Sequence, residues 1–234
     1  YRFLENYKLL AVVSSSFKNP SLYQLFSLYG NLDLIPEKST NLDFGMEWRS
    51  DDQKRFVQVA YFNRKITNGI IYENLDAFPF GIYQNQNEQR DQGVELDIVQ
   101  NVGFLRMNGN YTFLKGYAFQ SDSLVQDKTF NLLRRPQHAF NLGVGYSVSP
   151  KLNLDLNYQY MGSRNDRFYN SSTFMVEEVP LKAFGVLSLV ANYSVNDKLR
   201  LFANLRNITN IKYQEIYGFN SEPFNFKVGF SYQL

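Results

Sequence analysis

Apolar and polar residues alternate along most of this chain with a period of two. The clearest example is the segment 224–234, where every second residue is apolar: Phe224, Phe226, Val228, Phe230, Tyr232 and Leu234. The same alternation recurs over residues 138–146, 152–160, 187–193 and 199–205. Because side chains of a β-strand point alternately to its two faces, this pattern predicts strands with one apolar and one polar face. Helical periodicity fits none of these segments, so we expect an all-β protein.

The connections between these segments alternate strictly between short and long. Short polar connections, about 50 residues apart, lie near residues 50–53, 100–103, 147–151 and 195–198. Long connections rich in Asn, Ser, Tyr and charge lie near residues 17–37, 74–84, 115–135, 163–181 and 207–222. We therefore predict about ten strands, the third with a bulge near Asn63: 7–16, 38–49, 55–73, 83–99, 103–115, 136–148, 151–162, 183–194, 198–207 and 223–234.

Tight turns at one end and extended loops at the other are typical of outer-membrane barrels, whose strands turn apolar residues to lipid and polar residues to the lumen. We therefore predict a transmembrane antiparallel β-barrel segment, with extracellular long loops and aromatic residues at both membrane interfaces. A soluble sandwich or propeller is the alternative. A propeller blade, however, fits four strands into a repeat of about this length, whereas only two long strands are recognisable here.

Composition excludes several other classes. The chain has 234 residues, with 24 Lys plus Arg against 22 Asp plus Glu, and this balance gives no reason to expect a nucleic-acid partner. It has one His and no Cys, which excludes disulfides and metal sites built from Cys and His. The longest aliphatic run, residues 9–13, is far below the ~20 residues of a spanning helix. The chain begins at Tyr1 without an initiator Met, and we expect a processed or partial product.

Several segments resemble the C-terminal half of TonB-dependent outer-membrane receptors. They are FKNPSLYQLFSLYGNLDLIPEKSTNLDFGMEW (17–48), NRKITNGIIY (63–72), GVELD (93–97), LLRRPQHAFNL (132–142), YQYMGSRND (158–166) and NLRNITNIKYQEIYGF (204–219). Their order and spacing match over essentially the whole chain. The family's barrel has 22 strands and an N-terminal plug domain, so the resemblance implies that residues 1–234 form about the last ten strands, without plug or TonB box. It also implies a Gram-negative outer-membrane location. The family usually ends in an aromatic residue, where this chain has Leu234.

Within that family the chain looks most similar to the cobalamin transporters, through residues 132–135, 162–166 and 217–219. The resemblance therefore implies TonB-dependent uptake of a corrinoid, or of another large scarce nutrient. A siderophore or haem receptor is the alternative within the family, and a ten-stranded outer-membrane enzyme is the alternative from another class. The implied partners are the lipid bilayer, the remaining barrel strands, the plug and, through the plug, the TonB complex. A surface lipoprotein partner is left open.

No residues suggest catalysis, a cofactor or a metal site. The single His138 begins a strand on the apolar parity, where we expect an interfacial residue beside Tyr and Phe rather than a general base. Asp51 and Asp52 lie in a short turn and are expected to be solvated. Gly143 and Gly145 are expected to be small lumen-facing residues of a strand.

Recognition of a large ligand is the chemistry that the loops favour. Tyr side chains bury large surfaces at low entropy cost, and we expect ligand contacts from Tyr23, Tyr29, Tyr83, Tyr169 and Tyr217. Phe119 and Phe130 add aromatic surface to the third long loop. In cobalamin transporters the first residue of a pair such as Arg134 and Arg135 is implied to face the ligand. Unbroken strand parity would instead turn Arg135 inward, and Pro136 can shift the register, so Arg134 is predicted first and Arg135 second.

Overall fold

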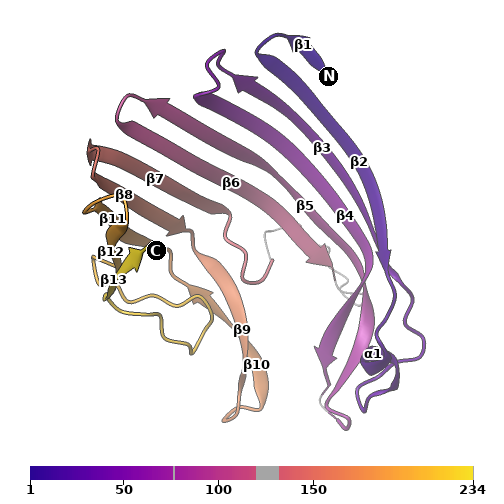
Figure 1. The fold of residues 1–234 in the computed structure, drawn as a ribbon. Coiled ribbons are helices and arrows are strands. Elements are labelled where there is room, and N and C mark those ends of the chain that lie inside the picture. Colours follow the sequence, from indigo (N-terminus) through magenta and orange to yellow (C-terminus); the bar gives the residue numbers. More distant parts are fainter. Residues whose placement is uncertain (76, 120–131, 234) are drawn as a thin grey trace.

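The computed structural model describes residues 1–75, 77–119 and 132–233. Eleven strands form one antiparallel sheet in the order β1-β2-β3-β4-β5-β6-β7-β8-β11-β12-β13, and β9 and β10 form a separate hairpin (Figure 1). The large sheet curves around a concave face, with β1 and β2 at one edge and β13 at the other (Figure 1). In the described part of the chain, no helix is long and apolar enough to cross a membrane.

The elements have the following bounds. The strands are β1 (Arg2–Leu4), β2 (Tyr7–Lys18), β3 (Glu37–Arg49), β4 (Arg55–Asn74), β5 (Gly81–Val102), β6 (Leu105–Phe119), β7 (His138–Ser149), β8 (Leu152–Met161), β9 (Arg164–Asn170), β10 (Met175–Leu181), β11 (Phe184–Ser194), β12 (Leu199–Arg206) and β13 (Asn225–Tyr232). The helix is α1 (Leu22–Phe26). All ten predicted strands are confirmed, with ends shifted by a few residues.

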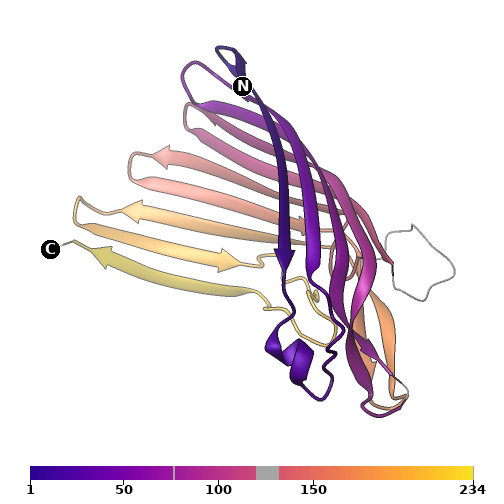
Figure 2. The same cartoon turned by 90° about the vertical axis from the view of Figure 1, so that its right-hand side faces the viewer.

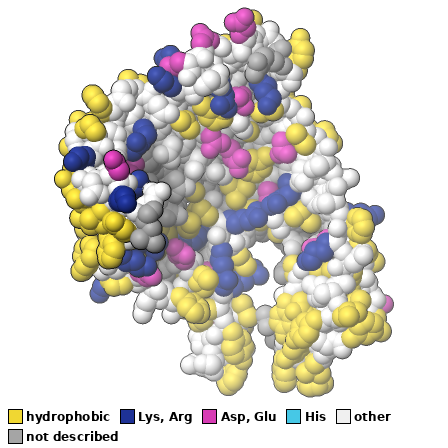
Figure 3. Space-filling view, viewed as in Figure 1, with side chains coloured by type: hydrophobic (Ala, Val, Ile, Leu, Met, Phe, Trp, Pro, Cys, Tyr) yellow, Lys and Arg dark blue, Asp and Glu magenta, His cyan; other side chains and the backbone are white. Residues whose placement is uncertain are grey.

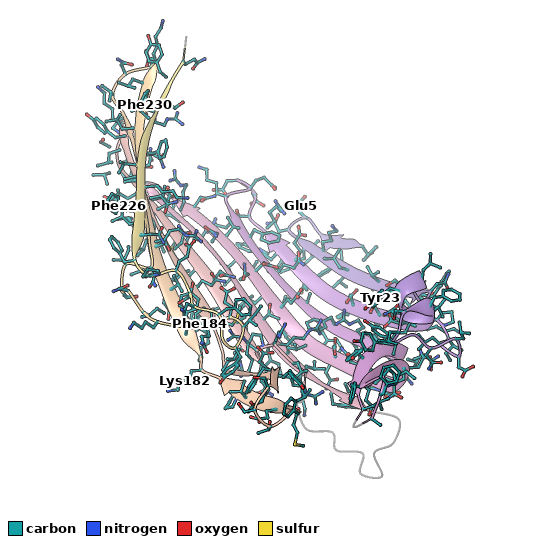
Figure 4. All side chains as sticks on the ribbon, turned by 90° about the horizontal axis from the view of Figure 1, so that it is seen from below. Glu5, Tyr23, Lys182, Phe184, Phe226 and Phe230 are labelled. Atoms are coloured by element: carbon teal, nitrogen blue, oxygen red, sulfur yellow. The ribbon has the colours of Figure 1, made fainter. Side chains whose placement is uncertain are left out.

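Strand register joins the alternating residues into two continuous faces. Leu156 of β8, Leu189 of β11, Leu205 of β12 and Phe226 of β13 are successive cross-strand partners, so they form one apolar row. One residue further along, Asn157 faces Ser188, and this row belongs to the polar face. Seen from the loop end, Phe226 and Phe230 point away from the concave face (Figure 4). The apolar face is therefore the convex one, as predicted for a lipid-facing surface.

Few apolar side chains are buried among the residues that the structure describes. Among the described residues, the only buried apolar side chains are Leu34, Leu132, Leu181 and Phe184. In contrast, Val228 and Phe230 on the convex face are each 71% exposed. An exposed apolar surface of this extent marks contact with a membrane or a partner. The apolar rows do not meet one another, so the sandwich and the propeller are both excluded.

The loop end holds more regular structure than the sequence predicts. The segment 163–181, expected as a long loop, contains the hairpin of β9 and β10, paired from Arg164↔Leu181 to Asn170↔Met175. The loop after β2 contains α1, which begins with a capping box between Ser21 and Gln24. Strands that cross a membrane need an apolar face toward lipid, and this face makes them recognisable in the sequence. A hairpin outside the membrane needs no apolar face. The alternation that reveals the other strands is therefore weak in β9 and β10.

Two other expectations are wrong, one about the connection after β4 and one about a bulge within β4. The connection expected over 74–84 is short, because β4 and β5 stay paired as far as Asn74↔Gly81 and form a tall ribbon. The bulge expected near Asn63 is absent, since Asn63 pairs in register with Leu42 and Gln92. The irregular residue of β4 is Asn68, whose φ is 57°.

The short turns and the long connections lie at opposite ends of the sheet (Figure 2). In the turn after β3, the Ser50 hydroxyl donates a hydrogen bond of 2.6 Å to Asp52, and this bond lowers the pKa of that carboxyl. Asp52 thus closes a turn. Among the described residues, no group of three or more His, Asp or Glu side chains is placed to hold a metal ion. Phe130 and Leu234, and the side chain of Phe119, lie outside the described residues.

Candidate ligand-binding site

A buried carboxylate on β5 gathers two arginines at the loop end of the lumen. Asp91 is 1% exposed and faces Arg64 of β4 as its direct cross-strand partner. Arg64 donates to Asp91 Oδ2 through Nε at 3.0 Å and also through Nη2. Arg135 donates to the same oxygen through Nη1 at 2.8 Å, and the Gln89 amide donates to Oδ1 at 3.0 Å. Two guanidinium groups share one carboxylate, so this cluster carries one excess positive charge.

The excess charge is accessible from the lumen. The side chains of Arg64 and Arg135 are 35% and 42% exposed, respectively. Figure 3 shows Lys and Arg side chains gathered in the hollow of the concave face. Beside Arg135 lies a cavity of about 410 Å³ between the β4–β5 ribbon and β9. Its lining residues are Ile71, Tyr72, Gln86, Gln89, Ala118, Leu132, Leu133, Arg135 and Arg167.

Four tyrosines form an aromatic cluster that reaches this cavity through Tyr72. The ring centroids of Tyr72 and Tyr83 are 5.3 Å apart, those of Tyr29 and Tyr72 5.6 Å, and those of Tyr23 and Tyr83 6.1 Å. All three pairs have steep interplanar angles, the edge-to-face arrangement that aromatic rings prefer. Gly81 makes room for the cluster, because a Cβ there would lie 2.0 Å from the Tyr72 hydroxyl oxygen.

A second buried carboxylate joins three segments of the loop end. Asp166 of β9 is 1% exposed and accepts hydrogen bonds from Arg134 Nε at 2.5 Å, from the backbone N–H of Arg167 at 2.8 Å and from that of Tyr217 at 2.9 Å. Burial alone would raise the pKa of Asp166, but these hydrogen bonds lower it by more, so the net pKa lies below the ordinary value of 3.8. Asp166 therefore stays ionised and connects the segment before β7, the hairpin and the β12–β13 connection.

Arg164 strengthens the same junction through backbone carbonyl groups. It is 4% exposed and donates through Nη2 to the backbone carbonyl oxygens of Gln214 at 2.6 Å and Glu215 at 3.1 Å. Its guanidinium lies over the Phe184 ring, 5.3 Å from the centroid, and Phe184 stacks on Tyr213 at 4.2 Å. The β12–β13 connection is thereby packed against the base of the hairpin.

The structure brings most of the predicted site residues into these clusters. Tyr23, Tyr29 and Tyr83 belong to the tyrosine cluster, and the Tyr217 ring packs on Phe168 at 4.4 Å beside Asp166. Tyr169 is 59% exposed and joins neither group.

The two predicted arginines have separate partners. Arg134 binds Asp166 of β9 and Arg135 binds Asp91 of β5, so the two arginines reach different strands. Neither arginine lies in a strand, because β7 begins at His138 and Arg134 has a φ of 58°. This backbone conformation, together with the bridge between Leu133 and Asn165, removes the segment from strand parity.

Sequence reasoning missed Arg64, Asp91 and Asp166. Arg64 and Asp91 could have been found from their place in the period-two alternation, since both fall on the polar face of long predicted strands. Asp166 carries no such signal. The predicted surroundings of His138 are confirmed: its Nδ1 lies 2.8 Å from the Tyr111 hydroxyl, and its ring centroid lies 5.2 Å from that of Phe113.

Comparison with known proteins identifies the class of this sheet. Residues 1–208 match the family model described as TonB dependent receptor-like, beta-barrel. The chain belongs to this family. TonB-dependent receptors lie in the outer membrane of Gram-negative bacteria, which agrees with the apolar convex face. They are receptors rather than enzymes.

Solved receptor structures share the fold. Pseudomonas aeruginosa FpvA bound to heterologous pyoverdines is 19% identical over 99% of this chain and 31% of that chain, with a TM-score of 0.80. The ferric-catecholate import receptor Fiu of E. coli K12 is 22% identical over 99% of this chain and 34% of that chain, with a TM-score of 0.79. The siderophore receptor PirA of Acinetobacter baumannii is 15% identical over 99% and 39%, with a TM-score of 0.75. The chain thus spans about a third of the length of these receptors.

Proposed function

We propose that this chain is the C-terminal part of a TonB-dependent receptor that takes up an anionic ferric siderophore. In this proposal the remaining strands of a 22-stranded barrel and the plug come from the rest of the protein, and the TonB complex acts through the plug. Residues 1–234 supply wall, lumen surface and loops. The observation that carries the proposal is the cluster of Arg64 and Arg135 around Asp91, whose excess positive charge lies beside an aromatic wall.

This arrangement suits the chemistry of a ferric chelate. The anionic oxygens around such an iron accept charge-assisted hydrogen bonds, and planar guanidinium groups match them well. Aryl rings of a catecholate ligand would pack on Tyr72 and Tyr83. Asp91 would act as a positioning residue, because it fixes both guanidinium groups while leaving one positive charge for the ligand.

A corrinoid, which the sequence resemblance favoured, is the second candidate. The similar solved structures are receptors for pyoverdine, ferric catecholate and other siderophores, and this supports the siderophore alternative. Charge supports it as well. Cobalamin carries no net charge and needs amide and aromatic contacts rather than an excess guanidinium. That Arg134, Arg135 and the predicted tyrosines contact the ligand is part of the siderophore proposal.

Ligand titration of the complete receptor tests the proposal. Ferric enterobactin, an anionic catecholate, ferrichrome, a neutral hydroxamate, and cyanocobalamin would each be titrated against wild type, Arg135→Gln and Arg106→Gln. Arg106 is the matched control, since it forms an exposed luminal ion pair with Asp155 at 3.2 Å. We expect Arg135→Gln to weaken the binding of ferric enterobactin about tenfold, which corresponds to a loss of about 1.4 kcal/mol of binding free energy. We expect the same substitution to leave the binding of cyanocobalamin unchanged. Tighter binding of cyanocobalamin than of either chelate, unchanged by Arg135→Gln, would refute the proposal.

A further inference from the structure

An ion pair on the hairpin of β9 and β10 lies at the cavity that Arg135 lines. Arg167 of β9 lines this cavity of about 410 Å³ from the hairpin, whereas Tyr72 lines it from the β4–β5 ribbon. The cross-strand partner of Arg167 is Glu178 of β10, which is not among the lining residues. Arg167 donates to Glu178 Oε1 through Nε at 2.9 Å and through Nη2 at 2.6 Å. A second guanidinium group therefore reaches the cavity.

The two arginines of this cavity are held in different ways. Asp91, the partner of Arg135, is 1% exposed and also binds Arg64. Pulling both arginines away would leave a buried charge unpaired, so Asp91 holds them firmly. The side chains of Arg167 and Glu178 are 46% and 54% exposed, and solvent screens an ion pair of this kind. The Arg167–Glu178 pair is therefore the exchangeable one.

The backbone holds Arg167 in place independently of Glu178. The N–H of Arg167 donates to Asp166 at 2.8 Å, within the ladder that joins β9 to β10. Glu177, the other acidic residue of β10, accepts a hydrogen bond from Asn170 at 2.7 Å and so has a different partner. Removing the charge of Glu178 therefore frees the guanidinium group without moving the strand that carries it.

We propose that Glu178 competes with the ligand for Arg167 and thereby makes the site select for negative charge. This inference rests on the proposed function, because it takes the ligand to be an anionic ferric chelate. An anionic oxygen in the cavity replaces Glu178 as the acceptor of Arg167, and the exposed carboxylate returns to water. A neutral ligand cannot replace it and leaves the pair closed. Arg167 is thus a specificity-determining contact, and Glu178 is the positioning residue that restrains it.

Titration of the complete receptor with ferric enterobactin and with ferrichrome tests this proposal through substitutions of opposite effect. We expect Glu178→Gln to strengthen the binding of ferric enterobactin about threefold, because Arg167 no longer has to leave a carboxylate. We expect Arg167→Gln to weaken it about fivefold. The variant Arg167→Gln/Glu178→Gln should bind as Arg167→Gln does, because Glu178 acts through Arg167. Ferrichrome, which is neutral, should gain nothing from Glu178→Gln.

Asp155→Asn is the matched control for the loss of one negative charge. Asp155 forms a similarly exposed ion pair with Arg106, and neither residue lines the cavity. We expect this variant to bind ferric enterobactin as wild type does. A gain equal to that of Glu178→Gln would mean that net charge alone sets the affinity, and this result would overturn the inference. Heat-modifiable mobility on gels confirms that each variant is folded.

Three further outcomes would overturn the inference. The first is binding of ferric enterobactin by Glu178→Gln that equals or falls below that of wild type. The second is a gain that persists in Arg167→Gln/Glu178→Gln, and the third is an equal gain for ferrichrome. Weakening by Arg135→Gln without a gain by Glu178→Gln refutes this inference alone. Tighter binding of cyanocobalamin than of either chelate, unchanged by Arg135→Gln, refutes the proposed function itself.

Discussion

Replacing Asp166 with Ala should release the β12–β13 connection from the hairpin while leaving the barrel wall folded. Asp166 is 1% exposed and accepts three hydrogen bonds, and its removal leaves the part-buried backbone N–H groups of Arg167 and Tyr217 without this acceptor. Each unsatisfied donor costs about 1 kcal/mol or more. The Arg134 side chain is 52% exposed, so solvent reduces its ion pair to a contribution of about 1 kcal/mol or less. The sum is about 3 kcal/mol, or a roughly 100-fold increase in local opening.

Hydrogen exchange measured by mass spectrometry on the complete receptor reads this opening directly. We expect peptides covering residues 213–219 to lose protection about 100-fold in Asp166→Ala and peptides of β11 and β12 to stay unchanged. Asp197→Ala, in an exposed short turn at the opposite end, is the control. Unchanged protection at Tyr217 in Asp166→Ala would refute the idea that this carboxylate joins the segments.

The pH dependence of the same contact follows from the depressed pKa of Asp166. A carboxyl whose pKa is lower in the folded state stabilises that state above its unfolded pKa, here near the ordinary 3.8. This stabilisation is lost only as pH falls through the still lower folded value. We therefore expect protection at Tyr217, corrected for intrinsic exchange rates, to be flat from about pH 8 to 5 and to fall below about pH 4. A loss of protection centred near neutral pH would contradict this assignment.

Two further predictions concern the barrel wall. Gly93→Ala should lower thermal stability markedly, because a Cβ at Gly93 would lie 2.0 Å from the Phe113 carbonyl oxygen, whereas Gly109→Ala should be tolerated because its nearest contact is 3.5 Å. Equal melting temperatures for the two variants would contradict the packing described here. Val228→Arg, on the apolar face, should cost about 2–4 kcal/mol of folding free energy in lipid, and Ser231→Arg, on the polar face, much less. Equal costs in urea titrations in vesicles would show that the two faces are assigned wrongly.

Much of the fold could be predicted because the decisive information is local. A period of two decides which side chains share a face, and the lipid-facing role requires that face to be apolar along the whole strand. The alternation from Phe226 to Tyr232 therefore predicted both β13 and the direction of its side chains. The hairpin of β9 and β10 could not be found in this way, because strands that extend beyond the membrane have no apolar face to maintain.

The candidate site was predicted only in part, for a related reason. Tyr23, Tyr29 and Tyr83 stood out by composition, but their meeting depends on how α1 and the tall β4–β5 ribbon pack. Arg64 and Asp91 became partners through strand register. Arg135 joins them from 44 residues away along the chain, from a segment that lies before β7 and outside any strand. Sequence alone thus determined a curved sheet with one apolar, lipid-facing surface and one polar surface that faces the lumen. Only the tertiary structure decided which charges share a carboxylate, because such pairs are made by distant segments whose approach no local period encodes.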